Sequence, residues 1–206
     1  MSHAVSLFDH SAIMLRPWAE AGYQCWAVDI DHRIGDMEVD GINLVRHDLS
    51  TPWLPPFARS EIVFVAAFPP CDHLAVSGAR WFKGKGLRAL ASSIELFATA
   101  AEFCEWSNAR YMIENPVSTI STYWRKPDHT FSPYQYAGFE STENYTKKTC
   151  LWGGGGFIMP EPFTLEGAPE PDDRIHKMPP SAERAALRSQ TPRGFALAVF
   201  EANHRD

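Results

Sequence analysis

One stretch of the chain decides its expected fold: Ile62-Val63-Phe64-Val65-Ala66-Ala67-Phe68-Pro69-Pro70-Cys71. Its first seven residues form an apolar run too short for helical periodicity, which is typical of a buried strand in a parallel sheet. A second such run, Tyr111-Met112-Ile113, ends at Glu114-Asn115-Pro116. Ligands of open parallel sheets bind at the carboxyl ends of the strands. The sequence therefore predicts a thiol and a carboxylate at the ligand-binding edge of the sheet.

Apolar runs on either side of this stretch complete an alternation of strands and helices. Further strands are expected over Ala4–Phe8, Gln24–Asp29, Ile42–Val45 and Thr149–Trp152. Helices are expected over Ile13–Ala21, Gly86–Ser107 and Gly194–Asn203. Strands that alternate with helices form a parallel sheet with right-handed crossovers. The predicted fold class is therefore α/β, with a doubly wound, mostly parallel sheet.

A single domain is expected over residues 1–206, since no repeat or independent second unit is visible. The stretch 153–180, rich in proline and glycine, is predicted to be a short extended connection. A further helix is expected to begin at Ser181-Ala182-Glu183-Arg184. No apolar stretch reaches bilayer length, and Met1-Ser2-His3-Ala4 does not resemble the start of a signal peptide. We therefore expect a cytoplasmic protein that does not contact membranes.

The cysteines and charges exclude some classes of site and leave others open. Cys25, Cys71, Cys104 and Cys150 are widely spaced, which predicts reduced thiols and neither a zinc site nor a disulfide scaffold. A net charge of −6 does not favour general affinity for nucleic acid. Local basic clusters could still line one groove: Lys83, Lys85 and Arg88; Arg125 and Lys126; Lys147 and Lys148; Arg184, Arg188 and Arg193.

Cys71 and Glu114 are the predicted catalytic residues. Two prolines stiffen the backbone before Cys71, and a helix opening within Asp72–Trp81 would lower the pKa of the thiol. A carboxylate such as Glu114 at a buried strand end is costly unless it is paired or used. The alternatives are an inert buried cysteine and a structural acid that caps a loop. We do not expect His73 to pair with Cys71, since side chains at i and i+2 diverge, and the other three cysteines are assigned to the core.

Acids after the earlier strands indicate a nucleotide-like ligand. A carboxylate at the end of the second strand commonly accepts hydrogen bonds from ribose hydroxyls, and Asp29, or alternatively Asp31, occupies this place. Asp48 follows the third strand, where it could accept a hydrogen bond from an adenine amino group. The first turn, Asp9-His10-Ser11-Ala12, lacks the glycines that allow close approach of a pyrophosphate. A cofactor without phosphates is therefore favoured.

The order of these features resembles the DNA (cytosine-5) methyltransferases, particularly short members of phage or prophage type. The matching motifs span almost the whole chain, and the Pro-Pro-Cys and Glu-Asn pair at this separation is their most specific part. They are Leu7-Phe8-Asp9-His10-Ser11, Ala27-Val28-Asp29-Ile30-Asp31, His47-Asp48-Leu49, Phe68-Pro69-Pro70-Cys71, Ile113-Glu114-Asn115-Pro116 and Thr191-Pro192-Arg193-Gly194-Phe195-Ala196.

The resemblance implies a Rossmann-like methyltransferase sheet, mostly parallel, with one reversed strand near the end. It implies that Cys71 is the nucleophile that adds to carbon 6 of cytosine. Glu114 would bind ring nitrogen 3 and the amino group. The implied S-adenosyl-L-methionine site is formed by Phe8, Ser11, Asp29, Ile30, Asp48, Leu49, Phe68 and Pro69. The implied substrate-binding residues are Pro70, Asn115, Lys147 and Lys148.

The chain departs from the family pattern at four points. The first turn has no glycine pair, and Asn115 precedes proline where the family more often has valine. The arginine motif is replaced by Gln135-Tyr136-Ala137-Gly138 and Lys147-Lys148-Thr149. Fewer than thirty residues separate Trp152 from Ser181, where the family usually inserts a target-recognition domain. Flipping a base out of a duplex requires groove contacts, so this last departure bears on the substrate.

Three functions are therefore open. The first is methyl transfer to carbon 5 of cytosine in DNA through a covalent cysteine adduct, with weak sequence preference or a protein partner that supplies target recognition. The second is the same chemistry on a free cytidine nucleotide or on single-stranded DNA. The third is a non-catalytic module that binds the cofactor, DNA or a protein. The presence of both Cys71 and Glu114 argues against the third, because such a module has no use for a strand-end nucleophile.

Overall fold

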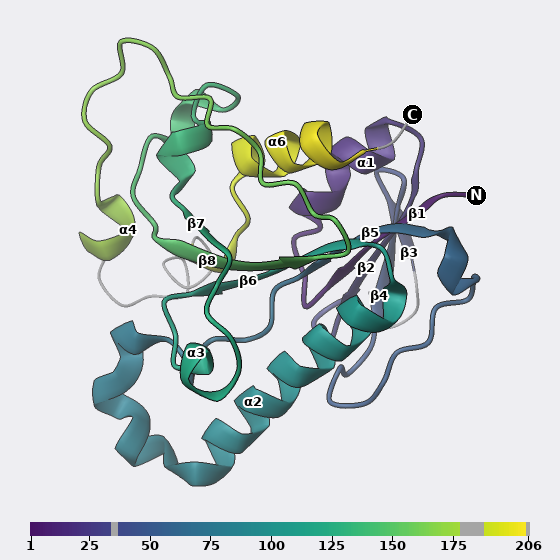
Figure 1. Ribbon diagram of the computed structural model, residues 1–206, viewed down its shortest axis with the longest axis horizontal. Helices are drawn as coiled ribbons and strands as arrows, with labels where there is room; N and C mark the ends of the chain where they lie inside the picture. Colours follow the sequence, from purple (N-terminus) through teal and green to yellow (C-terminus); the bar gives the residue numbers. More distant parts are fainter. Residues whose placement is uncertain (34–36, 178–187, 205–206) are drawn as a thin grey trace.

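The computed structural model describes residues 1–33, 37–177 and 188–204 (Figure 1). These residues form an eight-stranded sheet of order β3-β4-β2-β1-β5-β6-β8-β7. Its strands are β1 (His3–Leu7), β2 (Gln24–Asp29), β3 (Met37–Val39), β4 (Ile42–Arg46), β5 (Ile62–Ala67), β6 (Arg110–Pro116), β7 (His129–Phe131) and β8 (Thr149–Gly154).

The centre of the sheet is parallel and its two edges are antiparallel. Strands β4, β2, β1, β5 and β6 pair in parallel in this spatial order. At one edge β3 runs antiparallel to β4, and at the other β8 runs antiparallel to β6 and β7 antiparallel to β8. The predicted α/β class with a mostly parallel sheet is confirmed, and the arrangement is compatible with a Rossmann-like fold.

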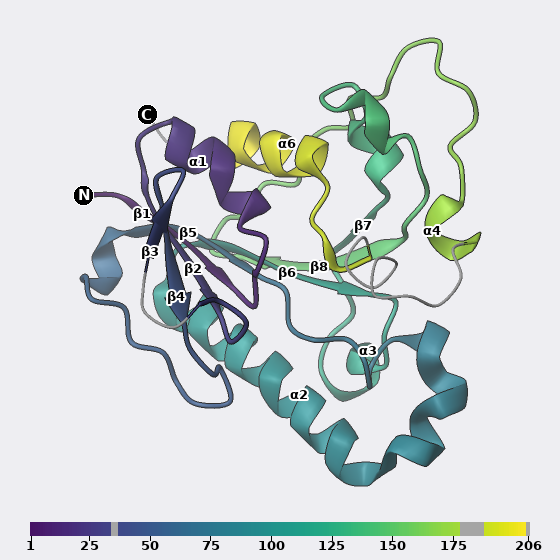
Figure 2. The same cartoon turned by 180° about the vertical axis from the view of Figure 1, so that it is seen from behind.

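Helices cover both faces of the sheet (Figures 1 and 2). The long helix α2 (Phe82–Ser107) lies on one face, and α1 (Arg16–Glu20) and α6 (Arg193–Asn203) lie on the other. Two short helices, α3 (Ile120–Tyr123) and α4 (Arg174–Lys177), belong to the connections. Among the described residues, no helix has both the length and the apolar character that crossing a bilayer requires.

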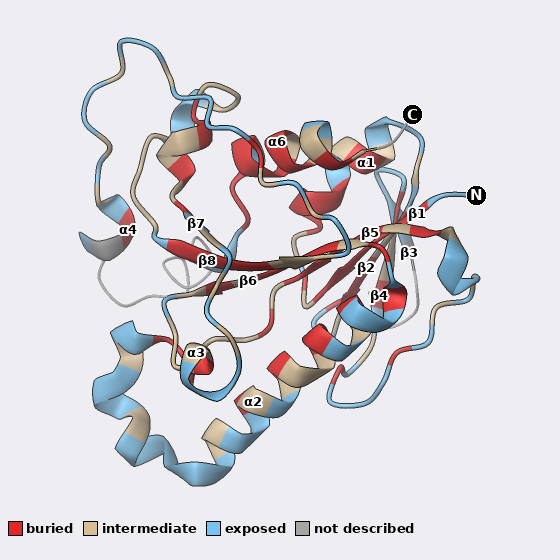
Figure 3. Ribbon diagram, in the orientation of Figure 1, coloured by how far each residue is buried: buried red, intermediate tan, exposed pale blue. Residues whose placement is uncertain are grey.

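Each face of the sheet has its own core because side chains alternate along a strand. On the α2 face, Val65 belongs to the same buried cluster as Phe97 of α2. On the opposite face, Phe64 stacks on Trp18 with ring centroids 4.6 Å apart, and Phe195 of α6 belongs to the same cluster. Figure 3 shows the inner sides of α2 and α6 buried against the central strands.

The strand boundaries differ from the predicted ones where backbone pairing continues beyond the apolar run. Strand β6 extends to Pro116 because Glu114 and Asn115 pair with Leu151 and Cys150 of β8. Glu114 therefore lies inside the strand rather than after it. Strand β8 likewise continues through Gly153 and Gly154. The sequence analysis missed β3, β7 and α3, which at three or four residues are too short for a period to be visible.

After β8, the described part of the predicted connection contains no strand and no helix before α4. Residues 155–173 contain turns and a bridge between Tyr145 and Asp172, and α4 follows. The helix predicted to begin at Ser181 lies outside the described residues. The helix predicted over Ile13–Ala21 starts as a 3₁₀ turn, Ile13–Leu15, before α1.

Candidate active site at the ends of strands β5 and β6

The sheet topology brings Cys71 and Glu114 to the same edge of the molecule. Strands β5 and β6 are adjacent and parallel, with Ala67 opposite Ile113. Cys71 lies four residues beyond this pair and Glu114 lies directly after it. Because the strands are parallel, both residues lie at the carboxyl ends, where the sequence analysis expected them.

A buried side chain fastens the two strand ends together. The Nδ2 of Asn115 donates a hydrogen bond of 2.9 Å to the carbonyl oxygen of Pro69. Asn115 is 1 % exposed, so this bond is shielded from water. It fixes the Pro69-Pro70-Cys71 segment relative to β6, which carries Glu114.

The loops that follow the two strands are also joined. The backbone N–H of Val76 donates to the Val117 carbonyl, and that of Thr119 donates to the Leu74 carbonyl, both at 2.9 Å. Ala75 and Ser118 form an antiparallel bridge between these bonds. The chain after Cys71 is therefore held by the chain after Glu114.

Burial and charge together raise the pKa of the Cys71 thiol to about 11. Desolvation is the largest cause, and the negative charges of Glu114 and Asp72 act in the same direction. Arg188 and Lys147 act in the opposite direction but do not compensate. The thiol, the Glu114 carboxyl and these two cations therefore share one electrostatic environment.

The prediction that a helix amino terminus lowers the pKa of Cys71 is wrong. The N–H groups of Leu74 and Ala75 donate to the Cys71 carbonyl at 2.9 and 2.8 Å, and the 3₁₀ helix η3 starts only at Val76. These backbone amides thus stabilise a turn at the Cys71 carbonyl, and burial dominates at the sulfur. The residue is half-buried, whereas Cys25, Cys104 and Cys150 are buried in the core, as predicted.

Burial also raises the pKa of Glu114, which favours its neutral form. The charge of Lys147 and the hydroxyl of Thr149 act in the opposite direction. Glu114 lies opposite Leu151 of β8, and side chains two residues apart share one face of a strand. Thr149 therefore lies on the Glu114 face of the sheet, and Lys147 lies just before β8, where its charge acts on Glu114.

The two lysines predicted to bind substrate act on different groups. Lys147 is half-buried beside Glu114, and its Nζ donates to the carbonyl of Gln190 at 3.2 Å. Lys148 is exposed, and burial raises the pKa of Cys150 against the opposing charge of Lys148. Of this pair, only Lys147 is placed to act at the candidate site.

The turn after β1 is built without glycine. Phe8 and Ala12 have φ values of 56° and 53°, in the left-handed region that glycine usually occupies. Asp9 holds the turn, since its Oδ1 accepts hydrogen bonds from Ser11 Oγ at 2.9 Å and from Ala12 N at 2.8 Å. The Ser11 hydroxyl, predicted to contact a cofactor, is therefore already bound to Asp9.

The predicted cofactor residues after β2 and β4 differ in exposure. Asp29 Oδ1 accepts from the N–H of Asp31 at 2.8 Å, and Ile30 is 51 % exposed beside it. Asp48 is exposed and accepts from the N–H of Ser50 at 2.9 Å. Leu49 is buried in the core cluster on the α2 face.

Phe68 and Pro69 lie next to the turn after β1. The N–H of Phe68 donates to the Leu7 carbonyl at 3.0 Å, directly before Phe8. Phe68 is half-buried, and Pro69 is buried. The predicted cofactor residues thus lie along four neighbouring strand ends, those of β4, β2, β1 and β5.

A pair of histidines at this edge was not predicted from the sequence. His32 is buried, its ring stacks on that of His10 with centroids 5.5 Å apart, and burial lowers the pKa of His32. The Nε2 of His32 and the Oδ2 of Asp9 are buried and have no hydrogen-bond partner among the described residues. No sequence signal could identify them, because they meet only through the loops after β1 and β2.

These residues fit a polar cofactor without phosphates. Asp29 retains acceptor capacity for a ribose diol, since an ionised carboxylate has about four lone-pair sites. The exposed Ile30 offers apolar contact to a flat ring. The unsatisfied Oδ2 of Asp9 and Nε2 of His32 can bind polar groups of a ligand. Within the described part of the chain, no group of three or more His, Cys, Asp or Glu side chains could hold a metal ion.

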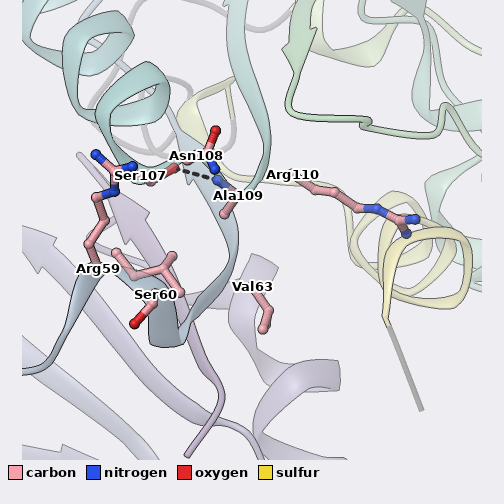
Figure 4. Close-up of a pocket in the computed structure, with 8 residues that line it drawn as sticks. Arg59, Ser60, Val63, Ser107, Asn108, Ala109 and Arg110 are labelled. Carbon is pink, nitrogen blue, oxygen red and sulfur yellow. Dashed lines mark hydrogen bonds between the residues drawn. The ribbon is translucent and has the colours of Figure 1, made fainter.

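A hollow of about 340 Å³ lies at the other edge of the sheet (Figure 4). It is lined at the amino ends of β5 and β6 by residues that include Arg59, Ile62, Asn108 and Arg110. Arg110 leads away from the other labelled side chains, and its Nη1 donates to the Asn203 carbonyl at 3.1 Å. None of the predicted site residues lines this hollow.

Comparison with known proteins finds no match. No protein-family model matches the chain. No curated protein matches it either. The residues at the ends of β5 and β6 and their surroundings are therefore the basis for a proposed function.

Proposed function

We propose that the protein transfers a methyl group from S-adenosylmethionine to carbon 5 of cytosine in DNA, through a covalent adduct with Cys71. One observation carries this proposal. The Cys71 thiol and the Glu114 carboxyl lie at adjoining strand ends, close enough for the Glu114 charge to raise the pKa of Cys71. The Asn115 bond to Pro69 holds these strand ends together.

Cys71 supplies the nucleophile in this reaction. Carbon 5 of cytosine is a poor nucleophile, and covalent addition at carbon 6 divides one difficult step into two easier ones. The Cys71 thiolate forms a bond to carbon 6, and the electron pair of the 5,6 double bond becomes available at carbon 5. S-adenosylmethionine would supply a methyl group on a positively charged sulfur; carbon 5 takes the methyl, and the bond electrons remain on the sulfur of S-adenosylhomocysteine. Transfer of the carbon 5 proton to a water molecule then restores the 5,6 double bond and expels the Cys71 thiolate.

Glu114 binds the side of the cytosine ring that lies opposite carbon 6. Burial raises its pKa, so Glu114 takes up a proton more readily than an exposed carboxyl, and the protonated group can donate a hydrogen bond to ring nitrogen 3. Its second oxygen can accept from the exocyclic amino group. These bonds withdraw electrons from the ring and make carbon 6 more receptive to the thiolate.

Lys147 and Arg188 support the ionised form of Cys71. Both charges lower the pKa of the thiol, against the larger effect of burial. A pKa of about 11 means that the thiol is mostly protonated near neutral pH. The two cations therefore stabilise the negative charge that develops on the Cys71 sulfur as the thiolate forms.

The remaining residues would form the cofactor site of a Rossmann-like methyltransferase. Asp29 would bind the ribose, with Ile30 and Asp48 next to the adenine. Phe8, Phe68 and Pro69 would line the space between the ribose and Cys71. Their positions at the neighbouring ends of β4, β2, β1 and β5 support this assignment.

Methyl transfer to defined substrates tests the proposal. The protein is incubated with methyl-labelled S-adenosylmethionine and either duplex DNA, single-stranded DNA or dCMP, and the digested product is searched for 5-methylcytosine. We expect label in 5-methylcytosine with at least one substrate and none with Cys71→Ser. Absence of label from all three substrates would refute the enzyme and favour a binding module.

A further inference from the structure

A basic arm projects from the sheet beside the candidate active site. We use this name for residues 76–88, which comprise η3 (Val76–Trp81) and the first turns of α2. Figures 1 and 2 show the arm extending away from the sheet, and Figure 3 shows it largely exposed. It belongs to no core cluster, so the packing of the sheet does not require it.

The charge of the arm is opposite to that of the whole chain. It carries Arg80, Lys83, Lys85 and Arg88, and no acid occurs between Asp72 and Glu95. The chain as a whole has a net charge of −6. A local concentration of cations on an acidic protein is complementary to a phosphate backbone.

Large apolar side chains lie exposed among these cations. Trp81 is 60 % exposed and Leu87 is 84 % exposed. The Arg80 guanidinium lies over the Trp81 ring, 5.0 Å from its centroid. An exposed aromatic ring between cations is the combination with which proteins stack the bases of single strands.

A hollow of about 380 Å³ lies at the base of the arm. Its lining combines apolar and basic side chains: His73, Phe82, Lys83, Lys85, Leu87 and Leu90. His73 is two residues from Cys71, so the hollow borders the loop that carries the nucleophile. A hollow with this lining offers an apolar surface for a base and cations for the phosphate beside it.

Two hydrogen bonds connect the arm to the candidate active site. The Nζ of Lys85 donates to the carbonyl of Asp72 at 2.7 Å, directly after Cys71. The Nη2 of Arg188 donates a hydrogen bond to Ser77 Oγ at 3.4 Å. The Arg188 charge also opposes the rise that burial causes in the pKa of Cys71. A DNA strand that lies along the arm would therefore extend to the Cys71 thiol.

We infer that the basic arm binds single-stranded DNA on one side of the target cytosine, with Lys83 and Lys85 on phosphates and Trp81 stacked on an unpaired base. This inference rests on the proposed function and names its substrate. A duplex keeps its base faces stacked, so Trp81 would have no partner there. A free nucleotide has one phosphate group and no neighbouring base, so it would not use the arm.

Binding measurements on the full chain test this inference. Fluorescence anisotropy is recorded with a labelled single-stranded oligodeoxynucleotide and with the duplex of the same sequence, over a range of salt concentrations. We expect tighter binding of the single strand. Trp81→Ala should weaken it by about fivefold or more, since stacking of one base is worth at least ~1 kcal/mol.

The lysines are tested through the salt dependence of binding. Replacing Lys83 and Lys85 together by alanine should lower the slope of log K against log salt by about 1.4, or about 0.7 for each phosphate that is no longer neutralised. Trp106→Ala and Arg59→Ala are matched controls, since both residues are exposed and lie away from the arm. Both control variants should bind the single strand as the wild type does.

The outcomes separate the arm from the chemistry. Equal binding of single strand by Trp81→Ala and wild type, or tighter binding of the duplex, would overturn the inference. If 5-methylcytosine still forms in that case, the proposed function stands and only the role of the arm is refuted. Single-strand binding that depends on the arm, without any methyl transfer, would support the inference and refute the enzyme.

Discussion

The two halves of the candidate site are held together in different ways. At the ends of β1, β2 and β4, each aspartate side chain accepts a hydrogen bond from the residue two positions further along its own loop. The donors are Ser11 for Asp9, Asp31 for Asp29 and Ser50 for Asp48. At the ends of β5 and β6, the bonds join distant parts of the chain. Asn115 and Pro69 are 46 residues apart, and the loops after the two strands are joined at Ala75 and Ser118.

This difference teaches where the molecule is pre-organised. Bonds between loops fix Cys71 relative to β6 and Glu114 before any ligand binds, as a covalent step requires. The acids that bond within their own loops do not cross-link the loops after β1, β2 and β4 in this way, although backbone bonds from Phe8 to Val28 and from His47 to Asp29 join the strand ends themselves. We therefore expect changes at the β5 and β6 ends to affect turnover, and changes at the β1 end to affect binding and stability.

The largest effect is expected at the nucleophile. Cys71→Ser should reduce methyl transfer by about a thousandfold or more, because a hydroxyl is a much weaker nucleophile than a thiolate. Binding of S-adenosylmethionine, measured by isothermal titration calorimetry, should remain near the wild-type value, since the sulfur belongs to the other half of the site. Retained turnover would remove the chemistry from the β5 and β6 ends.

The next effect concerns the bond between the strand ends. Asn115→Ala should lower the free energy of unfolding by about 1–3 kcal/mol, because it leaves the buried Pro69 carbonyl without its partner, and should also lower turnover about tenfold. The matched control is Asn43→Ala, which removes a 3.0 Å bond to the Cys25 carbonyl between β4 and β2. Urea unfolding should show a loss of stability in both variants, whereas turnover should fall only in the first. Equal turnover in the two variants would contradict the pre-organised site.

Opposite charges around the thiol give a third comparison. Alkylation of Cys71 by iodoacetamide should accelerate about tenfold per pH unit between pH 7 and 9, because these values lie below its pKa of about 11. Glu114→Gln removes a charge that raises this pKa, and Lys147→Ala removes one that lowers it. At fixed pH the first variant should therefore react faster than the wild type and the second more slowly, each by about threefold or more.

Mass spectrometry of the Cys71 peptide measures these rates. The three core cysteines serve as internal controls, since they are buried and should react only when the protein unfolds. Rate changes of the same sign in the two variants would mean that neither charge acts on the thiol.

The smallest effect is expected at the turn after β1. Burial raises the pKa of Asp9 above its ordinary value of 3.8, so the folded protein holds this proton more tightly than the unfolded chain. The stabilisation is complete below pH 3.8 and is lost as the pH rises through the folded-state pKa. Asp9→Asn should therefore gain stability relative to the wild type over this range, by ~1.4 kcal/mol for each unit of pKa shift.

Urea unfolding between pH 4 and 8 measures this gain. Ser11→Ala provides a comparison of opposite sign, because the Ser11 hydroxyl bond lowers the Asp9 pKa. Ser11→Ala should therefore raise the pKa of Asp9 further, so the free energy of unfolding of this variant should continue to fall up to a higher pH than in the wild type. A difference between Asp9→Asn and wild type that does not change with pH would contradict the assignment.

The sequence predicts the features that short-range patterns determine. The apolar runs predict the parallel strands, and their order predicts that Cys71 and Glu114 share an edge. The different surroundings of Lys147 and Lys148 could not be predicted, because they depend on the path of the chain before β8 and on the distant segments that it meets. The raised pKa of Cys71 depends on burial by distant segments, and the His10–His32 contact depends on loops that no period describes.

The backbone conformation of Gly86 has a consequence for how this protein can change during evolution. Its φ of 82° and ψ of 170° interrupt α2, so the helix behind it packs on the sheet while the residues before it turn away. One torsional joint thus separates a tightly packed scaffold from an outlying module. Segments inserted, shortened or transplanted on the outer side of this joint would leave the hydrophobic layers undisturbed, which makes it a natural boundary for exchanging specificity between otherwise similar chains.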